Sequence, residues 1–553
     1  MAVAKRFIDE LGLVEAINEK VEWNKEHWNI SPGGLAKAFI MSTLTDIRVP
    51  LTHVSERLKG VDLEYLIGED AEEHEVNSFN IGRAFDRIAE IDYEGLYASQ
   101  ALSALQIYKI PMTRSHGDTT TISFYGDYDV DQLDLSEEEL EELLKIEKGY
   151  NKDGRPECNQ IVVGQITNEF GVSIVSKVMD GSTSDVEWNK LALDYITKIR
   201  ESGFDTGIYV ADSKLVTNEL VTRMNDPENK ILFVSRCPAN FENKLEKRMI
   251  EQAYENENWD VLGQYGKGQN ASNYKGISFI ENICGAPTKL LVLESSALAA
   301  NTGSILDKEL KKFNSLVKEI EKKSFACQAD AEKEYAKFVK LKEKSLSLFD
   351  YSANIVKCVN EKWPRGRKGI NTCPVITETY QIRITNISVL EEACYRYLRD
   401  ESCIVLISNA TEDVTDRELL GIYKGQIVVE NSFRQLKNPQ LASVIYLKNP
   451  KRIQVLTMLL NFSLLIRALI QYRLRDGLKK RQEEHPDEVL RVGWAGRPLV
   501  NPTFKLFYEH AINCYFERDA PGEYSFTWPD EKTKKRVSTL LSLLSLTIDT
   551  LLL

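Results

Sequence analysis

The stretch from residue 115 to 236 constrains the fold most, because its alternation of strand and helix patterns fits few architectures. Its first residues, SHGDTTTISFYGDY, are β-branched and aromatic, and two apolar runs joined by a short turn follow as a hairpin pattern. Helical and buried strand patterns then alternate. The predicted order is strand, strand, strand, helix, strand, helix, strand, over residues 115–126, 160–167, 171–179, 184–203, 207–212, 214–224 and 231–236. This order predicts an α/β fold with a mixed sheet flanked by helices.

Two aspartates occupy informative places in this order. Asp118 lies inside the first strand, where a buried carboxylate is costly unless it is paired or binds a metal. A partly exposed strand aspartate explains Asp118 equally well. Asp212 ends the fourth strand, and ligands of open α/β sheets bind at the carboxyl ends of strands, so its position favours a functional role.

A helix is predicted over residues 415–437. Thr415 and Glu418 form a capping box at its start, and Pro439 ends it. Gly421 and Gly425 each cost about 1 kcal/mol against alanine and leave room for a close approach.

This helix carries a polar stripe. Tyr423, Glu430 and Lys437 stand seven residues apart, close to two turns, and Arg434 follows Glu430 by four. Taken alone, the stripe is most simply a solvated face with a Glu430–Arg434 ion pair.

The stripe resembles the Y-x2-R-x3-E-x6-K signature of bacterial transposases of the insertion-sequence-four superfamily. Tyr423, Glu430 and Lys437 match, whereas Gln426 stands at the arginine position, so the phosphate contact of that cation is not carried over. The run Gly149–Asp185, with its tyrosine, lysine, Arg-Pro, hairpin and G-x-T-S-D, is also similar to one branch of this superfamily, as are residues 446–475.

The resemblance implies a ribonuclease H-like core and a DDE-type transposase. The residues that it assigns to two Mg²⁺ ions, for which Mn²⁺ can substitute, are Asp118, Asp212 and Glu430, and those that it assigns to DNA are Tyr423, Gln426, Arg434 and Lys437. The implied reaction is cleavage at the element ends and strand transfer by 3′-OH attack. The implied partners are double-stranded DNA with terminal inverted repeats, target DNA and, in the DNA complex, a second copy of the chain. The alternatives are a stand-alone metal-dependent nuclease and an inactive or domesticated DNA-binding derivative.

An inserted domain is expected because Asp212 and Glu430 are 218 positions apart (430 − 212), against 94 between the two aspartates (212 − 118). An apolar stripe within it, over 306–341, is expected to pack inside a helical hairpin, with a dimer contact as the alternative. The expected segments are a helical domain that binds DNA ends or lacks DNA contact (1–108), the first part of the core (109–238), an inserted α+β domain with a helical first half (239–402), the second part of the core (403–485) and a helical cap (486–553).

Composition limits the class of protein. The net charge of −13 argues mildly against nucleic acid, although basic runs occur at 363–368 and 473–481. Nine cysteines without a C-x-x-C pair indicate neither a disulfide framework nor a zinc site, which favours a reducing compartment. The resemblance implies a cytoplasmic protein of a bacterium or archaeon, associated with the nucleoid when bound to DNA. The longest apolar run, 455–470, contains Asn461 and Arg467, so no membrane span is expected.

Overall fold

The computed structural model describes the chain in two compact units. The first unit is Met1–Ser235 with Gly421–Leu553, and the second is Arg236–Leu420. The predicted insertion, 239–402, lies within the second unit. The described residues are 1–44, 54–126, 128, 143–256, 258–266, 271–341, 343–363, 365, 373–412, 414–437, 447–520 and 523–552.

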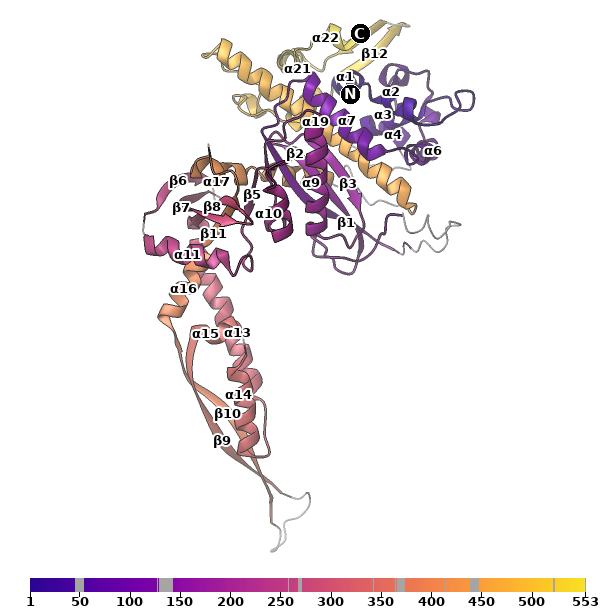
Figure 1. Ribbon diagram of the computed structural model, residues 1–553. Helices are drawn as coiled ribbons and strands as arrows, with labels where there is room; N and C mark the ends of the chain where they lie inside the picture. Colours follow the sequence, from indigo (N-terminus) through magenta and orange to yellow (C-terminus); the bar gives the residue numbers. More distant parts are fainter. Residues whose placement is uncertain are drawn as a thin grey trace. The chain divides into compact units, whose positions relative to one another are not determined.

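The first described hundred residues of unit 1 form a cluster of short helices (Figure 1), as predicted. Ser31 starts the helix α3 because its side chain accepts a hydrogen bond from the Gly34 N–H and Pro32 occupies the first turn. The α-helices are α1 (Ala2–Glu10), α2 (Leu13–Lys20), α3 (Pro32–Thr43), α4 (Val54–Arg57), α5 (Leu63–Ile67), α6 (Ser78–Ile88) and α7 (Tyr93–Ile107).

A mixed sheet forms the centre of unit 1, with strand order β3-β2-β1-β4-β5. β1 is antiparallel to β2, and β2 to β3, whereas β4 is parallel to both β1 and β5. The strands are β1 (Arg114–Phe124), β2 (Asn159–Asn168), β3 (Ser173–Met179), β4 (Ile208–Val210) and β5 (Phe233–Arg236), with α9 (Asp185–Glu201) before β4 and α10 (Asn218–Met224) before β5. The predicted order of elements, and the mixed sheet flanked by helices, are confirmed.

Helices cover both faces of this sheet. On one face Trp188 of α9 lies against Gly164, where a Cβ atom would stand 2.3 Å from the indole ring. Gln165, the next residue of β2, points to the other face because side chains alternate along a strand. There it accepts a hydrogen bond from Ser432 of α18 (Ile427–Leu436) and donates one to Asn461 of α19 (Pro450–Glu484).

Helix α19 is the core helix of unit 1. It is long and apolar enough to cross a membrane by length and composition alone, but 83% of its most apolar window is buried inside the protein. Phe462 packs on Tyr97 of α7, and Ser463 hydrogen-bonds Thr43 of α3. The apolar surface of α19 is therefore covered by other helices of unit 1.

The C-terminal segment corrects one prediction. Besides α20 (Phe504–Ala511), α21 (Glu531–Leu543) and α22 (Ile548–Leu552), it contains a two-stranded sheet of β12 (Tyr515–Ala520) and β13 (Glu523–Thr527). A purely helical cap is therefore wrong. The aromatic, alternating sequence around the Pro-Gly pair at 521–522 is a hairpin signal that the helical prediction overlooked.

Unit 2 corrects another prediction, because the first half of the insertion is not wholly helical. Four strands pair in the order β11-β8-β7-β6, all antiparallel. β7 and β8 form a local hairpin whose turn is Cys284 and Gly285, a signal that the helical prediction overlooked, whereas only β11 joins the sheet from a distant part of the sequence. Its elements are α11 (Leu245–Asn256), β6 (Asp260–Tyr265), β7 (Ser272–Ile283), β8 (Ala286–Ser295), α12 (Ser296–Ala300), α16 (Glu391–Glu401), β11 (Cys403–Ser408) and the start of α17 (Asp416–Lys424).

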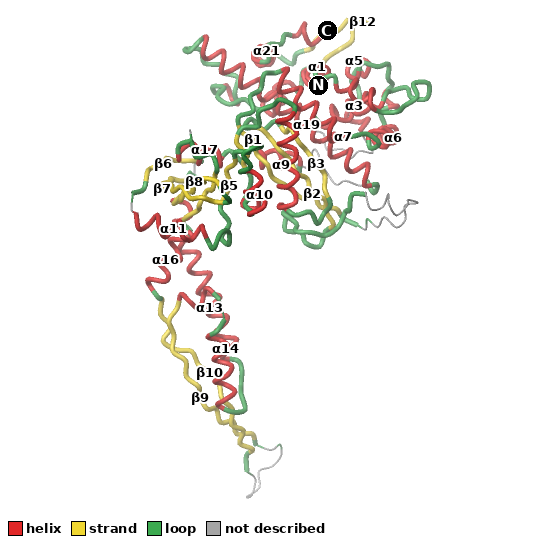
Figure 2. Tube along the Cα trace, in the orientation of Figure 1, coloured by secondary structure: helices red, strands yellow, loops and turns green. Residues whose placement is uncertain are grey.

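The rest of unit 2 is a long hairpin lined by helices. β9 (Phe349–Lys362) pairs with β10 (Val375–Val389), and α13 (Thr302–Glu321), α14 (Gln328–Val339) and α15 (Lys344–Leu348) complete the region (Figure 2). The predicted apolar stripe packs here, inside the chain: Phe313, Val317 and Phe338 share one core with Ile382 of β10. Intramolecular packing of the stripe is thus confirmed.

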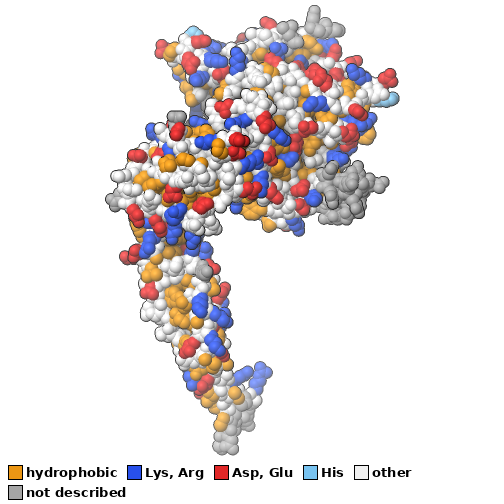
Figure 3. Space-filling view, viewed as in Figure 1, with side chains coloured by type: hydrophobic (Ala, Val, Ile, Leu, Met, Phe, Trp, Pro, Cys, Tyr) orange, Lys and Arg blue, Asp and Glu red, His pale blue; other side chains and the backbone are white. Residues whose placement is uncertain are grey.

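The surface is mixed in charge. On the face seen in Figure 3, Lys and Arg side chains are interspersed with Asp and Glu side chains. All nine cysteines lie among the described residues and are unpaired, in agreement with the sequence analysis. Most of the basic run at 363–368 lies outside the described residues.

Candidate active site

Asp118 and Asp212 are brought together by the parallel pairing of β1 with β4. In that pairing His116 stands opposite Val210, so each aspartate lies two residues further along its strand in the same register. Asp118 lies within β1, whereas Asp212 lies two residues beyond the end of β4 and caps a short 3₁₀ turn by accepting a hydrogen bond from the Lys214 N–H. The register therefore carries Asp118 and Asp212 to the same level on neighbouring strands, where the charge of Asp212 acts on Asp118.

The electrostatic state of both carboxyls reflects this crowding. Burial raises the pKa of Asp118 from 3.8 to about 6, with Lys152 opposing the rise and the charges of Asp212 and Asp185 adding to it. Burial, and then the charge of Asp185, also raise the pKa of Asp212. Ionised, these side chains repel one another, and either a proton or a nearby cation relieves that repulsion.

Asp185 and Lys152 are two members of this group that the sequence analysis did not select as site residues. Asp185 is the first residue of α9, and Ser184 caps this helix through a capping box with Glu187. The Lys152 Nζ lies 2.9 Å from Asp185 Oδ1 and 3.7 Å from Asp118 Oδ1. Their signal was present in the sequence, because the run Gly149–Asp185 contains both. We call Asp118, Asp185, Asp212 and Lys152 the acidic centre.

The predicted helix over 415–437 is two helices. The capping box is confirmed, since the Thr415 N–H donates to Glu418 Oε2 over 2.9 Å and the Glu418 N–H donates back to Thr415 Oγ1. However, α17 ends at Lys424 and α18 begins at Ile427. Pro439 lies outside the described residues.

The break between α17 and α18 stands where Gly425 meets β1. A Cβ atom at Gly425 would lie 2.9 Å from Cε1 of His116, so glycine permits the close approach that the sequence suggested. His116 is fully buried, both of its ring nitrogens lack a hydrogen-bond partner among the described residues, and burial lowers its pKa to about 4. His116 is thus a neutral residue that packs beneath the break.

The stripe lies on α18 and around the break. Tyr423 and Gln426 are half-buried, whereas Glu430 and Arg434 are exposed. The exposure of Glu430 and Arg434 agrees with a solvated face, but in the described part of the chain these two side chains form no ion pair, so that part of the simple interpretation is wrong. Lys437 pairs with Asp153 at 2.6 Å. Lys437 stands seven residues after Glu430, and its partner Asp153 follows Lys152 in sequence, so this ion pair links the end of α18 to the segment that carries Lys152.

The sheet geometry places Asp118 on the face that α18 covers. Asp118 pairs directly with Gln165 across β1 and β2, and directly paired residues point to the same side. Gln165 is hydrogen-bonded to Ser432 on α18. Residues two apart on a helix point to nearly opposite sides. Ser432 faces the sheet, so Glu430 points away from the sheet and is exposed.

The carboxylate oxygens of the acidic centre are the type of ligand that a hard divalent cation prefers. Their burial and mutual repulsion would be relieved by a bound cation. Within the described ranges, no three His, Cys, Asp or Glu side chains are spaced to hold a metal ion.

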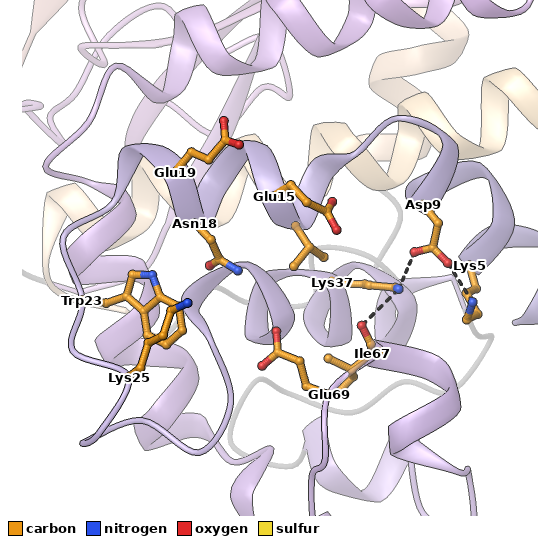
Figure 4. Close-up of a pocket in the computed structure, with 12 residues that line it drawn as sticks. Lys5, Asp9, Glu15, Asn18, Glu19, Trp23, Lys25, Lys37, Ile67 and Glu69 are labelled. Carbon is orange, nitrogen blue, oxygen red and sulfur yellow. Dashed lines mark hydrogen bonds and ion pairs between the residues drawn. The ribbon is translucent and has the colours of Figure 1, made fainter. Parts of the chain in front are cut away.

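A separate hollow lies in the N-terminal helices (Figure 4). It has a volume of about 540 Å³ and is lined by Glu15, Glu19 and Trp23, among others. On its floor Lys37, whose side chain is 3% exposed, donates to Asp9 over 2.5 Å and to the carbonyl of Ile67 over 3.2 Å. Burial lowers the pKa of Lys37, and both partners belong to neighbouring helices. We assign this lysine to helix packing.

Comparisons with known proteins identify one family model. Residues 1–102 match a domain described as "Domain of unknown function (DUF4277)". No curated protein matches the chain. Among solved structures the chain is similar to a piggyBac transposase in a synaptic complex with hairpin DNA, at 10% identity and a TM-score of 0.28, over 49% of this chain. The match spans 57% of the length of that transposase chain, and a likeness of this size carries no argument about fold or function.

Proposed function

We propose that the chain is a DNA transposase of an insertion sequence with a ribonuclease H-like core and a DDE-type active site. It cleaves DNA at the element ends and joins the freed 3′ ends to target DNA. The observation that carries the proposal is the pair Asp118 and Asp212, two crowded carboxyls at the same level on β1 and β4, on a sheet with the order β3-β2-β1-β4-β5.

The proposed roles follow from the carboxylates. Asp118 and Asp212 would each hold a divalent cation through carboxylate oxygens, and Glu430 would complete the set when α18 presents it to the centre. Two Mg²⁺ ions bound there would supply an activated water and charge stabilisation for the departing 3′ oxygen. Tyr209 lies beside this pair, and its pKa is raised by burial and by the charges of both aspartates, so its phenol stays protonated.

DNA would lie along the stripe. The ion pair of Lys437 with Asp153, the residue after Lys152, supports this placement, because a phosphate bound by Lys437 would lie near the segment that carries Lys152. Lys437 and Arg434 supply cations, and Tyr423 and Gln426 supply hydrogen-bonding groups, for the sugar-phosphate backbone. A second copy of the chain would bind the other element end, and Asp153 would release Lys437 when a phosphate competes for it.

The test uses purified protein and linear DNA that contains the gene with its flanks, in Mg²⁺. The native chain is compared with Asp212→Asn and with the matched control Asp194→Asn, an exposed aspartate of α9 that pairs with Arg223. We expect breaks at both flanks for the native chain and the control, and none for Asp212→Asn or in EDTA. Equal cleavage by Asp212→Asn would refute the proposal.

A second candidate function is DNA binding without cleavage, as in an inactive or domesticated derivative. The exposed position of Glu430, outside the acidic centre, favours it, together with glutamine at position 426. Binding to the flanks with no break in Mg²⁺ or Mn²⁺ would support this candidate. In that case Gln426→Arg is the variant to test for restored cleavage.

A further inference from the structure

Lys152 has an unusual place for a lysine next to a proposed metal site. Its Nζ lies 2.9 Å from Asp185 and 3.7 Å from Asp118. It also donates to the Thr119 carbonyl over 3.0 Å and to the Thr119 hydroxyl over 2.6 Å. An ammonium has three N–H donors, so the lysine is fully engaged by β1 and the first residue of α9.

The charges around Lys152 do not balance. Asp118, Asp185 and Asp212 act on one another electrostatically, and Lys152 is the cation that opposes the rise in the pKa of both Asp118 and Asp212. The backbone N–H of Lys214 lowers the pKa of Asp212 more than Lys152 does, but the charge of the Lys214 side chain lowers it less. The side chains of Lys152, Asp118 and Asp185 are each about one quarter exposed, so solvent screens them only in part.

From this geometry we propose that Lys152 is the resident counter-charge of the acidic centre and competes with the divalent cation for it. The inference rests on the proposed function, since it concerns the same carboxylates. In the chain without metal the ammonium holds Asp185 and Asp118 together. When a divalent cation binds the carboxylates, Lys152 is repelled, and its flexible side chain becomes free to contact a DNA phosphate beside them.

Metal binding alone tests this competition, with no need for catalysis. Mn²⁺ affinity is measured at pH 8 by titration with electron paramagnetic resonance, for the full-length native chain and Lys152→Met. Loss of the competing charge should lower the Kd for Mn²⁺ by about tenfold. In EDTA the variant should melt at a lower temperature than the native chain, and saturating Mn²⁺ should restore more of its stability.

Lys177→Met is the matched control. Lys177 is 27% exposed and pairs with Glu94 at 2.8 Å, away from the acidic centre. Its loss should lower the melting temperature but leave the Kd for Mn²⁺ unchanged. Lys152→Gln keeps a hydrogen-bond donor while it removes the charge, so it should tighten Mn²⁺ binding as Lys152→Met does.

The outcomes separate the two proposals. If the native chain binds Mn²⁺ and both Lys152 variants bind it with the native Kd, the competition is refuted and the proposed function stands. If the native chain does not bind Mn²⁺ at millimolar concentration, the proposed function fails and the competition with it. If neither Lys152 variant folds with or without Mn²⁺, the lysine is structural and the competition is refuted as well.

Discussion

Replacement of Asp118 by asparagine should change how stability depends on pH. The folded chain binds the proton of this carboxyl more tightly than the unfolded chain, because its pKa is raised from 3.8 to about 6. Between these two values the folded state holds more protons, so the free energy of unfolding falls as pH rises through this window. Asparagine has the shape of the protonated acid and cannot ionise, so Asp118→Asn should lose this fall.

The size of the effect follows from the two pKa values. The gap between 3.8 and about 6 corresponds to about 3 kcal/mol at about 1.4 kcal/mol per tenfold change in proton affinity. The side chain is 23% exposed, so solvent screening makes this an upper bound, and roughly 1–3 kcal/mol is expected. Relative to the native chain, Asp118→Asn should gain this much stability between pH 4.5 and pH 8.

Urea unfolding in EDTA at several pH values measures the difference. Circular dichroism follows the helices, and fluorescence follows the tryptophans, including buried Trp188. Asp194→Asn, at an exposed position of α9, should keep the native profile. Parallel pH profiles for Asp118→Asn and the native chain would refute the burial and crowding of Asp118.

Three further substitutions test the surroundings of the site. Gly425→Ala should destabilise the chain by about 1–3 kcal/mol in urea unfolding, because the added Cβ would meet the ring of His116 at 2.9 Å. The control is Gly303→Ala on α13, where the Cβ meets open space, so that alanine should be neutral or stabilising through its helix propensity. Ser432→Ala should cost about 1–3 kcal/mol in the same assay, because it leaves the buried amide oxygen of its partner on β2 without this donor; an unchanged midpoint would contradict that role. Lys437→Met should change the free energy of unfolding by less than about 1 kcal/mol. In a mobility-shift assay it should weaken DNA binding and reduce the salt dependence of that binding by about one phosphate contact. Equal DNA affinity of variant and native chain at every salt concentration would show that Lys437 does not contact DNA.

The pH dependence of His116 runs opposite to that of Asp118. Burial lowers the histidine pKa from 6.5 to about 4, so the folded chain holds fewer protons in this window and stability is lost as pH falls through it. His116 is present in both Asp118→Asn and the native chain, so the difference between their pH profiles reports Asp118 alone.

Local sequence determined the elements and the places of two site residues. The β-branched runs and the apolar period fixed the order of strands and helices in residues 115–236, because propensity and periodicity act over a few neighbours. Asp118 within a strand and Asp212 at the end of another followed directly from that order. The capping residues Ser184 and Thr415 likewise marked helix starts by local hydrogen bonds.

Tertiary structure decided what these elements bring together. The register of β1 against β4 sets Asp118 beside Asp212, and the loop that carries Lys152 reaches Asp185 across 33 residues of chain (185 − 152). The contact of His116 with Gly425 coincides with the break in a helix that local periodicity predicts as continuous. Such contacts depend on packing between segments distant in sequence, and neither propensity nor spacing records that packing.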